Sequence, residues 1–292
     1  MSRLPRLLYP LIVLSTPLMS TDTTPMELVK PTLDVGIIVS DLDKAKAFYG
    51  DALGFKPAAP IALPDGSVIT RYTNGTSSIK LRAFPNAGKY PAAVRKAIGF
   101  RLINFVVDDF DGVLARVAAQ GTAPPKPMEV GHDGMKYTFA TDPDGNQIEL
   151  VSLPPGKTAA EYDRIQVGLT VADPEKSRAF YGKILGFHEE KPLSPKALNG
   201  DLEYIFTAGK SNIKFWKGDG VDLPKHTGNI TDAIGFRYFT FIVKDVDAVY
   251  AAAKASGAAV AMPPTDLGKI ARIMMLSDPD GNWIEFAARK AQ

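Results

Sequence analysis

Hydrophobic and polar positions alternate over short stretches of the chain, and the first stretch precedes a segment with helical spacing. Residues 35–39 alternate as a strand does, since successive strand side chains point to opposite faces. Asp41 then stands where a helix N-cap is expected, apolar residues recur on one helix face from Ala45 to Leu53, and Gly54 is typical of a helix end. The pattern predicts a strand followed by a short amphipathic helix.

The rest of this unit reads as strands, and the pattern then starts again. A second strand and helix are expected at 101–107 and 110–120. Further strands are expected at 68–73, 77–83, 137–140 and 147–151. The order is a βαβββ module that occurs twice in each half of the chain. Because strands and helices are mixed, the predicted fold class is α+β rather than a doubly wound parallel sheet.

An internal repeat divides the chain into two halves. Three sequences recur: residues 33–55 at 165–187, Gly-Phe-Arg 99–101 at 235–237, and Asp-Pro-Asp-Gly-Asn 142–146 at 278–282. The first pair is identical at twelve of 23 positions. The predicted organisation is an N-terminal segment with a signal peptide (1–27), a first domain (28–153), a linker (154–161) and a second domain (162–289).

The composition excludes several kinds of chemistry. Of the 292 residues, 45% are hydrophobic and 23% are charged, as in ordinary globular proteins. The absence of cysteine excludes disulfides, thiolate metal sites and a cysteine nucleophile. A net charge of +2 with scattered basic residues gives no basis for a nucleic-acid partner. The chain has three histidines, His132, His188 and His226, and none of them has an assignable partner.

The first residues have the pattern of a secretory signal peptide. Arg3 and Arg6 precede an apolar run at 7–19, which is too short to span a bilayer as a mature helix. We therefore expect an exported, periplasmic protein, cleaved near Ser20, with no membrane span in its mature form. The alternative is that Met26 is the true initiator and that the protein is cytoplasmic.

Two motifs carry a family resemblance. D-x-x-K-(A/S)-x-A-F-Y-G-x-x-L-G-F and D-P-D-G-N-x-I-E occur in this order in both halves. In these motifs the chain resembles the vicinal-oxygen-chelate superfamily, the class of glyoxalases, bleomycin-resistance proteins and extradiol dioxygenases. The resemblance covers nearly the whole chain after residue 30. It implies tandem glyoxalase-like domains, in each of which two βαβββ modules form a curved, partly closed mixed sheet around a cavity.

The resemblance also implies four metal-ligand positions in each domain, usually His, Glu, His and Glu on the first, fourth, fifth and last strands. They fall on Asp34, Lys80, Leu102 and Glu149 in the first domain and on Gln166, Lys214, Tyr238 and Glu285 in the second. Only the last glutamate is retained in each domain. Because a lysine ammonium takes the place of a cation rather than binding one, we expect no metal and no other cofactor. The ion pairs Lys80–Glu149 and Lys214–Glu285 are expected instead.

Strand alternation names further cavity residues, because positions i and i+2 share a face. In the second domain the catalytic candidates Glu285, Lys214 and Tyr238 are joined by the ligand-binding candidates Gln166, Thr170, Asn212, Trp216, Thr240 and Trp283. The first domain offers a secondary site of Asp34, Lys80, Arg82, Asn104 and Glu149. The second domain is favoured as the working site because it combines both tryptophans with a few polar groups. Structural ion pairs and core tryptophans are the plainer alternatives.

Three functions remain open for a small-molecule partner. The first is metal-free binding of an aromatic-containing molecule, as in the antibiotic-sequestering members of the family. The second is a metal-dependent glyoxalase-like lyase or extradiol-type dioxygenase, which the family favours and the missing histidines oppose. The third is a metal-free lyase or isomerase with Glu285 as general base and Tyr238 as proton donor. The sequence leaves enzyme activity, ligand identity and oligomeric state, a homodimer included, undecided.

Overall fold

The structure is a computed structural model, and it describes residues 26–89, 93–121, 124, 126–130, 134–158, 161–162, 164–194, 198, 200–225 and 228–290. Four modules follow one another along the chain, each with a strand, a helical segment and three further strands. In the described part, no helix is long and apolar enough to cross a membrane. The expected signal segment lies outside the described residues, so export stays a prediction, as do the domain limits.

The modules share one order of elements but differ in the length of the second strand, which has 7, 3, 2 and 9 residues in turn. The first contains β1 (Asp34–Val39), α1 (Leu42–Lys46), the π-helical η1 (Ala47–Ala52), β2 (Lys56–Ala62), β3 (Val68–Asn74) and β4 (Ser77–Ala83). The second contains β5 (Gly99–Val107), α2 (Phe110–Ala119), β6 (Met128–Val130), β7 (Met135–Thr141) and β8 (Gln147–Ser152). The third contains β9 (Ile165–Val171), α3 (Pro174–Arg178), the π-helical η3 (Ala179–Ile184), β10 (His188–Glu189), β11 (Tyr204–Ala208) and β12 (Ser211–Lys217). The 3₁₀ helix η5 (Ile230–Asp232) precedes the fourth, which contains β13 (Gly235–Ile242), α4 (Val246–Ala255), β14 (Ala259–Leu267), β15 (Ala271–Ser277) and β16 (Trp283–Arg289).

The modules form two eight-stranded mixed sheets, and each sheet takes one module from each half of the chain. Sheet 1 combines the first and fourth modules in the order β14-β15-β16-β13-β1-β4-β3-β2. Sheet 2 combines the second and third in the order β10-β11-β12-β9-β5-β8-β7-β6. The modules join through the antiparallel pairs β1–β13 and β5–β9. The α+β class and the βαβββ order predicted from the sequence are confirmed.

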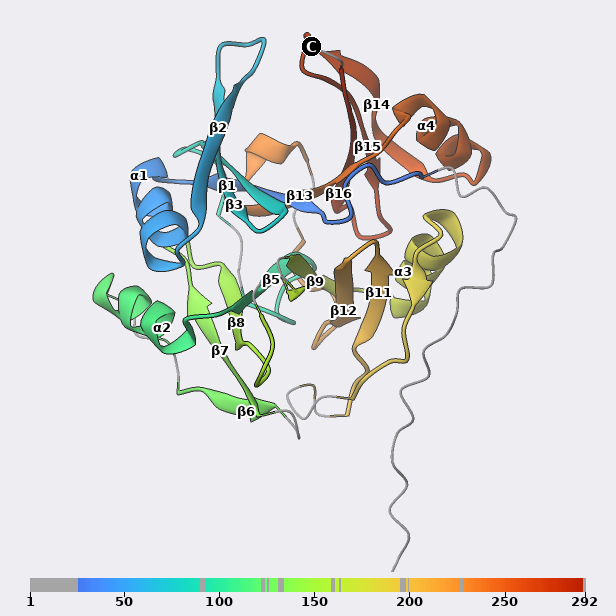
Figure 1. Cartoon of the computed structure of the whole chain (residues 1–292). Helices are drawn as coiled ribbons and strands as arrows, with labels where there is room; N and C mark the ends of the chain where they lie inside the picture. Colours follow the sequence, from blue (N-terminus) through green and yellow to red (C-terminus); the bar gives the residue numbers. More distant parts are fainter. Residues whose placement is uncertain are drawn as a thin grey trace, which may run out of the picture.

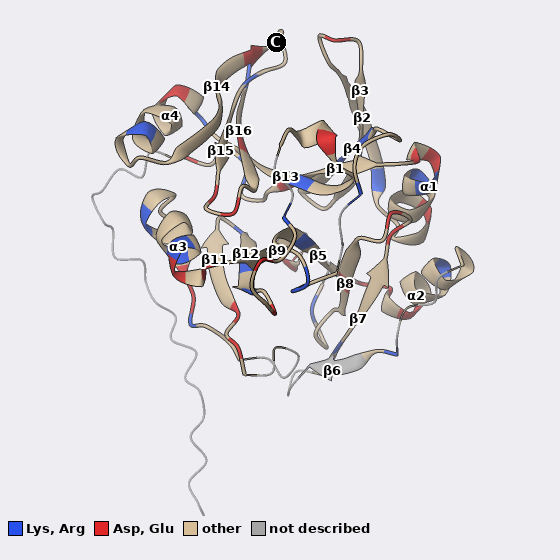
Figure 2. Ribbon diagram, turned by 180° about the vertical axis from the view of Figure 1, so that it is seen from behind, with Lys and Arg blue, Asp and Glu red and all other residues tan. Residues whose placement is uncertain are grey.

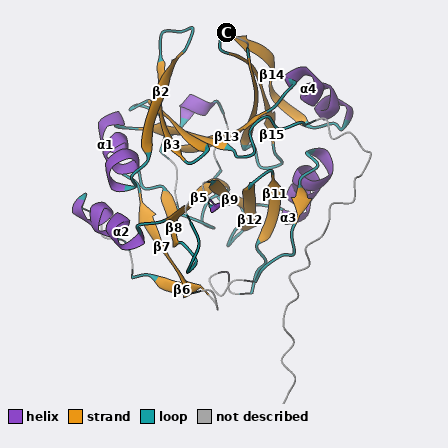
Figure 3. Ribbon diagram, viewed as in Figure 1, coloured by secondary structure: helices purple, strands orange, loops and turns teal. Residues whose placement is uncertain are grey.

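The two sheets curve away from each other and turn their convex faces inward (Figure 1). Apolar side chains of both sheets and of the helices form one continuous core between them. Phe100 of β5, for example, contacts Phe236 and Phe239 of β13, with ring centroids 5.1 and 5.9 Å apart. The helices cover the two sides of this core (Figure 3). The polar strand positions are therefore left on two concave faces, which open in opposite directions.

A buried tyrosine–aspartate bond joins the two modules of each half. The Tyr49 hydroxyl of η1 donates to Oδ2 of Asp142 at 2.8 Å, and Tyr181 of η3 donates to Asp278 over the same distance. In both cases the tyrosine belongs to the repeated Phe-Tyr-Gly and the aspartate to the repeated Asp-Pro-Asp-Gly-Asn. The two repeated motifs thus meet across the core, although their modules lie in different sheets.

The environment of Asp142 makes this contact sensitive to pH. Burial raises the pKa of Asp142 to about 6, against the effect of the hydrogen bonds from Asn146 and Tyr49. A carboxyl group whose pKa is higher in the folded than in the unfolded state contributes its full stabilisation at pH values below the unfolded-state pKa. For Asp142 this contribution is lost as the pH rises through about 6.

We predict that Tyr49→Phe lowers the free energy of unfolding, and more so at higher pH. The change removes a donor from a buried carboxyl group, which needs that donor most when it is ionised. The expected loss is about 1 kcal/mol near pH 4.5 and about 2 kcal/mol near pH 7.5. Urea unfolding measures both, with Tyr204→Phe, a change to a half-buried tyrosine of β11, as the control. Equal losses at the two pH values would contradict the prediction.

Candidate functional site

The predicted ion pairs are wrong in their partners. Lys80 pairs with Glu285 rather than Glu149, and Lys214 lies beside Glu149 rather than Glu285. Each observed pair joins modules that are neighbours in a sheet but belong to different halves of the chain. Strand alternation indicates which face a side chain lies on, but not which two modules share a sheet. The candidates grouped in each predicted domain are therefore divided between two concave faces.

On the concave face of sheet 1, Lys80 stands at the centre of a buried polar cluster. Its Nζ donates to Oε2 of Glu285 at 2.6 Å and to Oγ1 of Thr240 at 2.5 Å. The Thr240 hydroxyl donates to the same Glu285 oxygen at 2.5 Å. Burial by itself lowers the pKa of Lys80, but the groups around it, Glu285 first and then Tyr238 and Asp34, together outweigh burial, and the pKa lies above its usual value. Lys80 is therefore a permanent cation in this cluster.

Tyr238 packs directly against β1 because residue 36 is glycine. A Cβ atom built on Gly36 would lie 1.9 Å from Cε1 of Tyr238, so a larger residue would displace the ring. The Lys80 ammonium lies 4.6 Å from the ring centroid, at the distance of a cation–π contact. Burial raises the pKa of Tyr238, although Lys80 acts in the opposite direction. The phenol therefore stays protonated at neutral pH and can donate a hydrogen bond.

Further cations surround this face. Lys30 pairs with Asp34, whose carboxylate also accepts from the backbone N–H of Ser78 at 2.6 Å. Arg71 and Arg82 extend from β3 and β4. Among the described residues Arg71 has no carboxylate partner, and Arg82 lies 3.9 Å from the exposed carboxylate of Asp65. The face therefore carries more positive than negative charge. Sequence reasoning missed Lys30 and Arg71, because their approach depends on contacts between strands.

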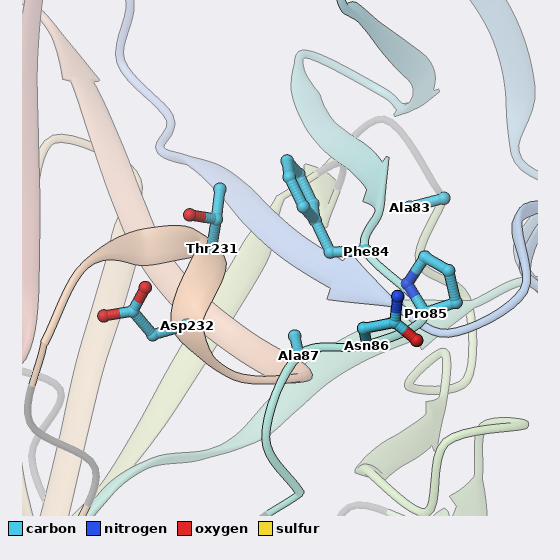
Figure 4. A pocket seen from close by; sticks show the side chains of 7 residues that line it. All are labelled: Ala83, Phe84, Pro85, Asn86, Ala87, Thr231 and Asp232. Carbon is cyan, nitrogen blue, oxygen red and sulfur yellow. The ribbon is translucent and has the colours of Figure 1, made fainter.

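A hollow of about 530 Å³ lies where β4 ends, and Figure 4 shows its lining. Phe84 follows Lys80 and Arg82 at the two-residue spacing of one strand face, and the Arg82 guanidinium lies 5.0 Å from the centroid of its ring. The hollow thus begins about 13 Å along the strand from Lys80. Sequence reasoning missed it, because it lies beyond the predicted strands. Its other lining residues are Ala83, Pro85, Asn86, Ala87, Thr231 and Asp232.

The concave face of sheet 2 carries a looser version of the cluster. Nζ of Lys214 lies 3.8 Å from Oε2 of Glu149, and the Asn104 amide donates to the same oxygen at 2.7 Å. Gln166 lies opposite Asn104 on the neighbouring strand. Burial raises the pKa of Glu203 beside them, and Lys214 counteracts this. The lysine here has fewer close partners than Lys80 has.

The chain itself fills one end of this second face. Trp216 is buried in a small cluster with Leu102 and Leu198. The backbone N–H of Arg95 donates to the Thr170 hydroxyl at 3.0 Å. Two predicted ligand-binding residues, Trp216 and Thr170, are therefore engaged by other parts of the same chain, and they lie in the other sheet from Glu285.

The remaining candidates lie away from both clusters or at their edges. Asn212 accepts a hydrogen bond at 3.2 Å from a threonine of β11. Trp283 is half-buried at the start of β16, beside Tyr238 of β13. His188 is exposed, whereas His132 and His226 lie outside the described residues.

Comparison with known proteins identifies the family of this chain. The model of the Glyoxalase/Bleomycin resistance protein/Dioxygenase superfamily matches residues 32–150 and 163–286, which is most of the chain. The chain belongs to this superfamily. The resemblance inferred from the two sequence motifs is thereby confirmed.

Several relatives of this chain match it over most of their own length. A lactoylglutathione lyase from Schizosaccharomyces pombe is 28% identical over 297 residues, which cover 87% of this chain and 95% of the relative. A putative glyoxylase from Mycobacterium bovis is 25% identical over 253 residues, covering 85% and 90%. The structure of glyoxalase I from Zea mays has a TM-score of 0.68 with 21% identity, covering 88% of this chain and 92% of that one. The structural similarity shows a shared fold.

The metal-ligand positions implied by the glyoxalase superfamily hold residues that do not fit a divalent ion. Sheet 1 brings together Asp34, Lys80, Tyr238 and Glu285, and sheet 2 brings together Leu102, Glu149, Gln166 and Lys214. In each set a lysine faces the retained glutamate, and catalytic zinc sites need about three protein ligands. Among the residues that the structure describes, no group of three or more His, Asp or Glu side chains could hold a metal.

We predict that Lys80→Met destabilises the protein more than Lys214→Met does. Lys80 is the closer partner of its glutamate, so its loss strands a buried carboxylate. The expected loss is about 3 kcal/mol for Lys80→Met and about 1 kcal/mol for Lys214→Met. Urea unfolding measures both. Combining Lys80→Met with Glu285→Leu should recover most of the lost stability, because no charge is then left unpaired. Equal losses for the two single variants would contradict the prediction.

Proposed function

We propose that the concave face of sheet 1 binds a small anionic molecule that carries carbonyl or hydroxyl oxygens, and that it catalyses proton transfer on this molecule without a metal, as a lyase or isomerase. The observation that carries the proposal is the Lys80 ammonium, held 2.6 Å from Glu285 and 2.5 Å from Thr240 at a metal-ligand position of the superfamily. A fixed cation in a buried site stabilises negative charge that develops on a ligand oxygen.

The three central side chains supply complementary chemistry. Glu285 is the proton acceptor. Among the described residues, both hydrogen bonds that its carboxylate accepts go to Oε2, which leaves Oε1 to face the ligand. Loss of a proton from a carbon next to a carbonyl moves negative charge to the carbonyl oxygen. Lys80 and the protonated Tyr238 stabilise that oxygen, and Tyr238 can return a proton. The chemistry requires only groups that this face brings together.

Charge and shape indicate the class of ligand. Arg71 and Arg82 add positive charge beyond the Lys80–Glu285 and Lys30–Asp34 pairs, which favours an acidic group on the ligand. The hollow beside Phe84 offers an aromatic surface for the rest of the molecule. This site differs from the one favoured from sequence, since it needs the first module of the chain as well as the fourth.

A metal-dependent glyoxalase-like lyase is the second candidate function. The 28% identity to a lactoylglutathione lyase over 87% of the chain favours it. In that case a metal ion would have to bind beside Glu285 in competition with the Lys80 ammonium. The two candidates therefore differ in whether activity needs added metal.

We predict that S-lactoylglutathione, an anionic thioester, binds to the purified protein in the presence of EDTA. Calorimetry should show saturable binding that falls by about tenfold or more in Lys80→Met, because the ligand oxygen loses its cation. Lys214→Met, the equivalent change in sheet 2, is the control and should bind as the parent protein does. Binding that appears only when metal is added would favour the second candidate, and no saturable binding would contradict the proposed ligand class.

Proton transfer on the same probe is followed by proton NMR in D₂O. The lactoyl α-proton should exchange with solvent in the presence of EDTA, and Glu285→Gln should reduce the rate by about a hundredfold or more, because the proton acceptor is removed. If the probe binds but its α-proton does not exchange, the protein is a binding protein rather than an enzyme.

We also predict that Lys80→Glu creates a metal site. This change removes the resident cation and places a third carboxylate beside those of Asp34 and Glu285, a set that suits a divalent ion. Elemental analysis after dialysis against Zn²⁺ should find about one ion per chain in the variant and substoichiometric zinc in the parent protein. Lys254→Glu is the control, since it makes the same change at an exposed lysine of α4. Equal zinc in Lys80→Glu and its control would contradict the prediction.

A further inference from the structure

The repeated Gly-Phe-Arg sequences bring two arginines to one small cavity in the middle of the molecule. Arg101 lies near the start of β5 and Arg237 near the start of β13, and both line a cavity of about 20 Å³ together with Asn282 and Trp283. Figure 2 shows the basic segments of β5 and β13 near the middle of the molecule, where the two sheets lie back to back. This cavity is separate from the Lys80 cluster and plays no part in the proposed function.

Arg101 is a mostly buried cation without an anionic partner. Its guanidinium donates to the backbone carbonyl oxygens of Ala97 and Ile98, at 3.3 Å for Ala97. Among the described residues no carboxylate forms an ion pair with it, and burial lowers its pKa to about 10. The group still carries its charge at neutral pH. A buried charge of this kind is stabilised when a counter-ion accompanies it.

The acidic residues nearest in sequence to the cavity are directed elsewhere. Asp278 accepts hydrogen bonds from the Tyr181 hydroxyl and the Asn282 amide nitrogen. Asp280 accepts from the backbone N–H of Ala172. Asn282 therefore presents its uncharged amide oxygen toward Gly99 at the cavity edge. Nothing described at the cavity carries a full negative charge.

We propose that this cavity is an anion site, in which Arg101 holds a halide ion, chloride under ordinary conditions. Arg237 lines the same cavity, and its guanidinium donates to the backbone carbonyl oxygens of Ile230 and Asn229 at 3.0 Å. The size limits the occupant to one small particle, because a volume of about 20 Å³ is little more than the roughly 10–15 Å³ that one water-sized occupant needs, and the unpaired charge of Arg101 favours an anion. The occupant lies between β5 and β13, so it adds to the contact between the two sheets. It lies beside Trp283, whose fluorescence can report it.

The test uses iodide as the probe and Trp283 as the reporter. Trp216→Phe leaves Trp283 as the single tryptophan. Fluorescence is titrated with sodium iodide at constant ionic strength, with gluconate as the balancing anion. We expect a saturable part of the quenching, and chloride should shift its half-saturation to higher iodide. Adding Arg101→Met should remove the saturable part, whereas Arg101→Lys and the exposed control Arg116→Met should retain it.

Purely linear quenching with the same slope with and without Arg101→Met would overturn the proposal. A second measurement does not depend on the folding of that variant. The parent protein should melt several degrees higher in chloride than in gluconate at the same ionic strength, because an ion that binds only the folded state stabilises it. Identical melting temperatures in the two salts would also overturn the proposal. Neither result bears on the Lys80 site, which S-lactoylglutathione binding tests separately.

Discussion

The antiparallel pairing of β1 with β13, matched by that of β5 with β9, is the constraint on which both concave faces depend. It joins strands about two hundred residues apart in sheet 1 and places Asp34 opposite Thr240. Lys80 can reach Glu285 only because this pairing puts the first and fourth modules side by side. Neither half of the chain holds a complete cluster alone, so each site needs one module from each half.

The two concave faces have the same arrangement of strands and differ in a few side chains. At equivalent register positions sheet 1 has Thr240 and Tyr238, and sheet 2 has Asn104 and Leu102. The hydroxyl of Thr240 bonds both Lys80 and Glu285, whereas the Asn104 amide bonds Glu149, and Nζ of Lys214 stays 3.8 Å from that glutamate. One face therefore concentrates charge and adjoins an open hollow, while the other is partly filled by Trp216 and its neighbours.

Buried charged groups have three kinds of partner in the part of the chain that the structure describes. In the sheet 1 cluster a cation and a carboxylate neutralise each other within hydrogen-bond distance. Asp142 and Asp278 accept bonds from tyrosine hydroxyls, and burial raises the pKa of both. Among the described residues Arg101 has only backbone carbonyl oxygens as partners, and on this observation we propose that it takes an anion from solution.

The sequence by itself determined the local order: the βαβββ modules, the aspartate N-cap at Asp41, and the face on which each strand residue lies. These features depend on spacings of two to four residues, which a sequence displays directly. The partners of Lys80 and Lys214 were decided only by the tertiary structure. Either arrangement of the modules buries the same apolar faces, so alternation cannot distinguish them. The choice is made by edge-to-edge hydrogen bonds between distant strands, whose backbone donors and acceptors are the same in every residue except proline.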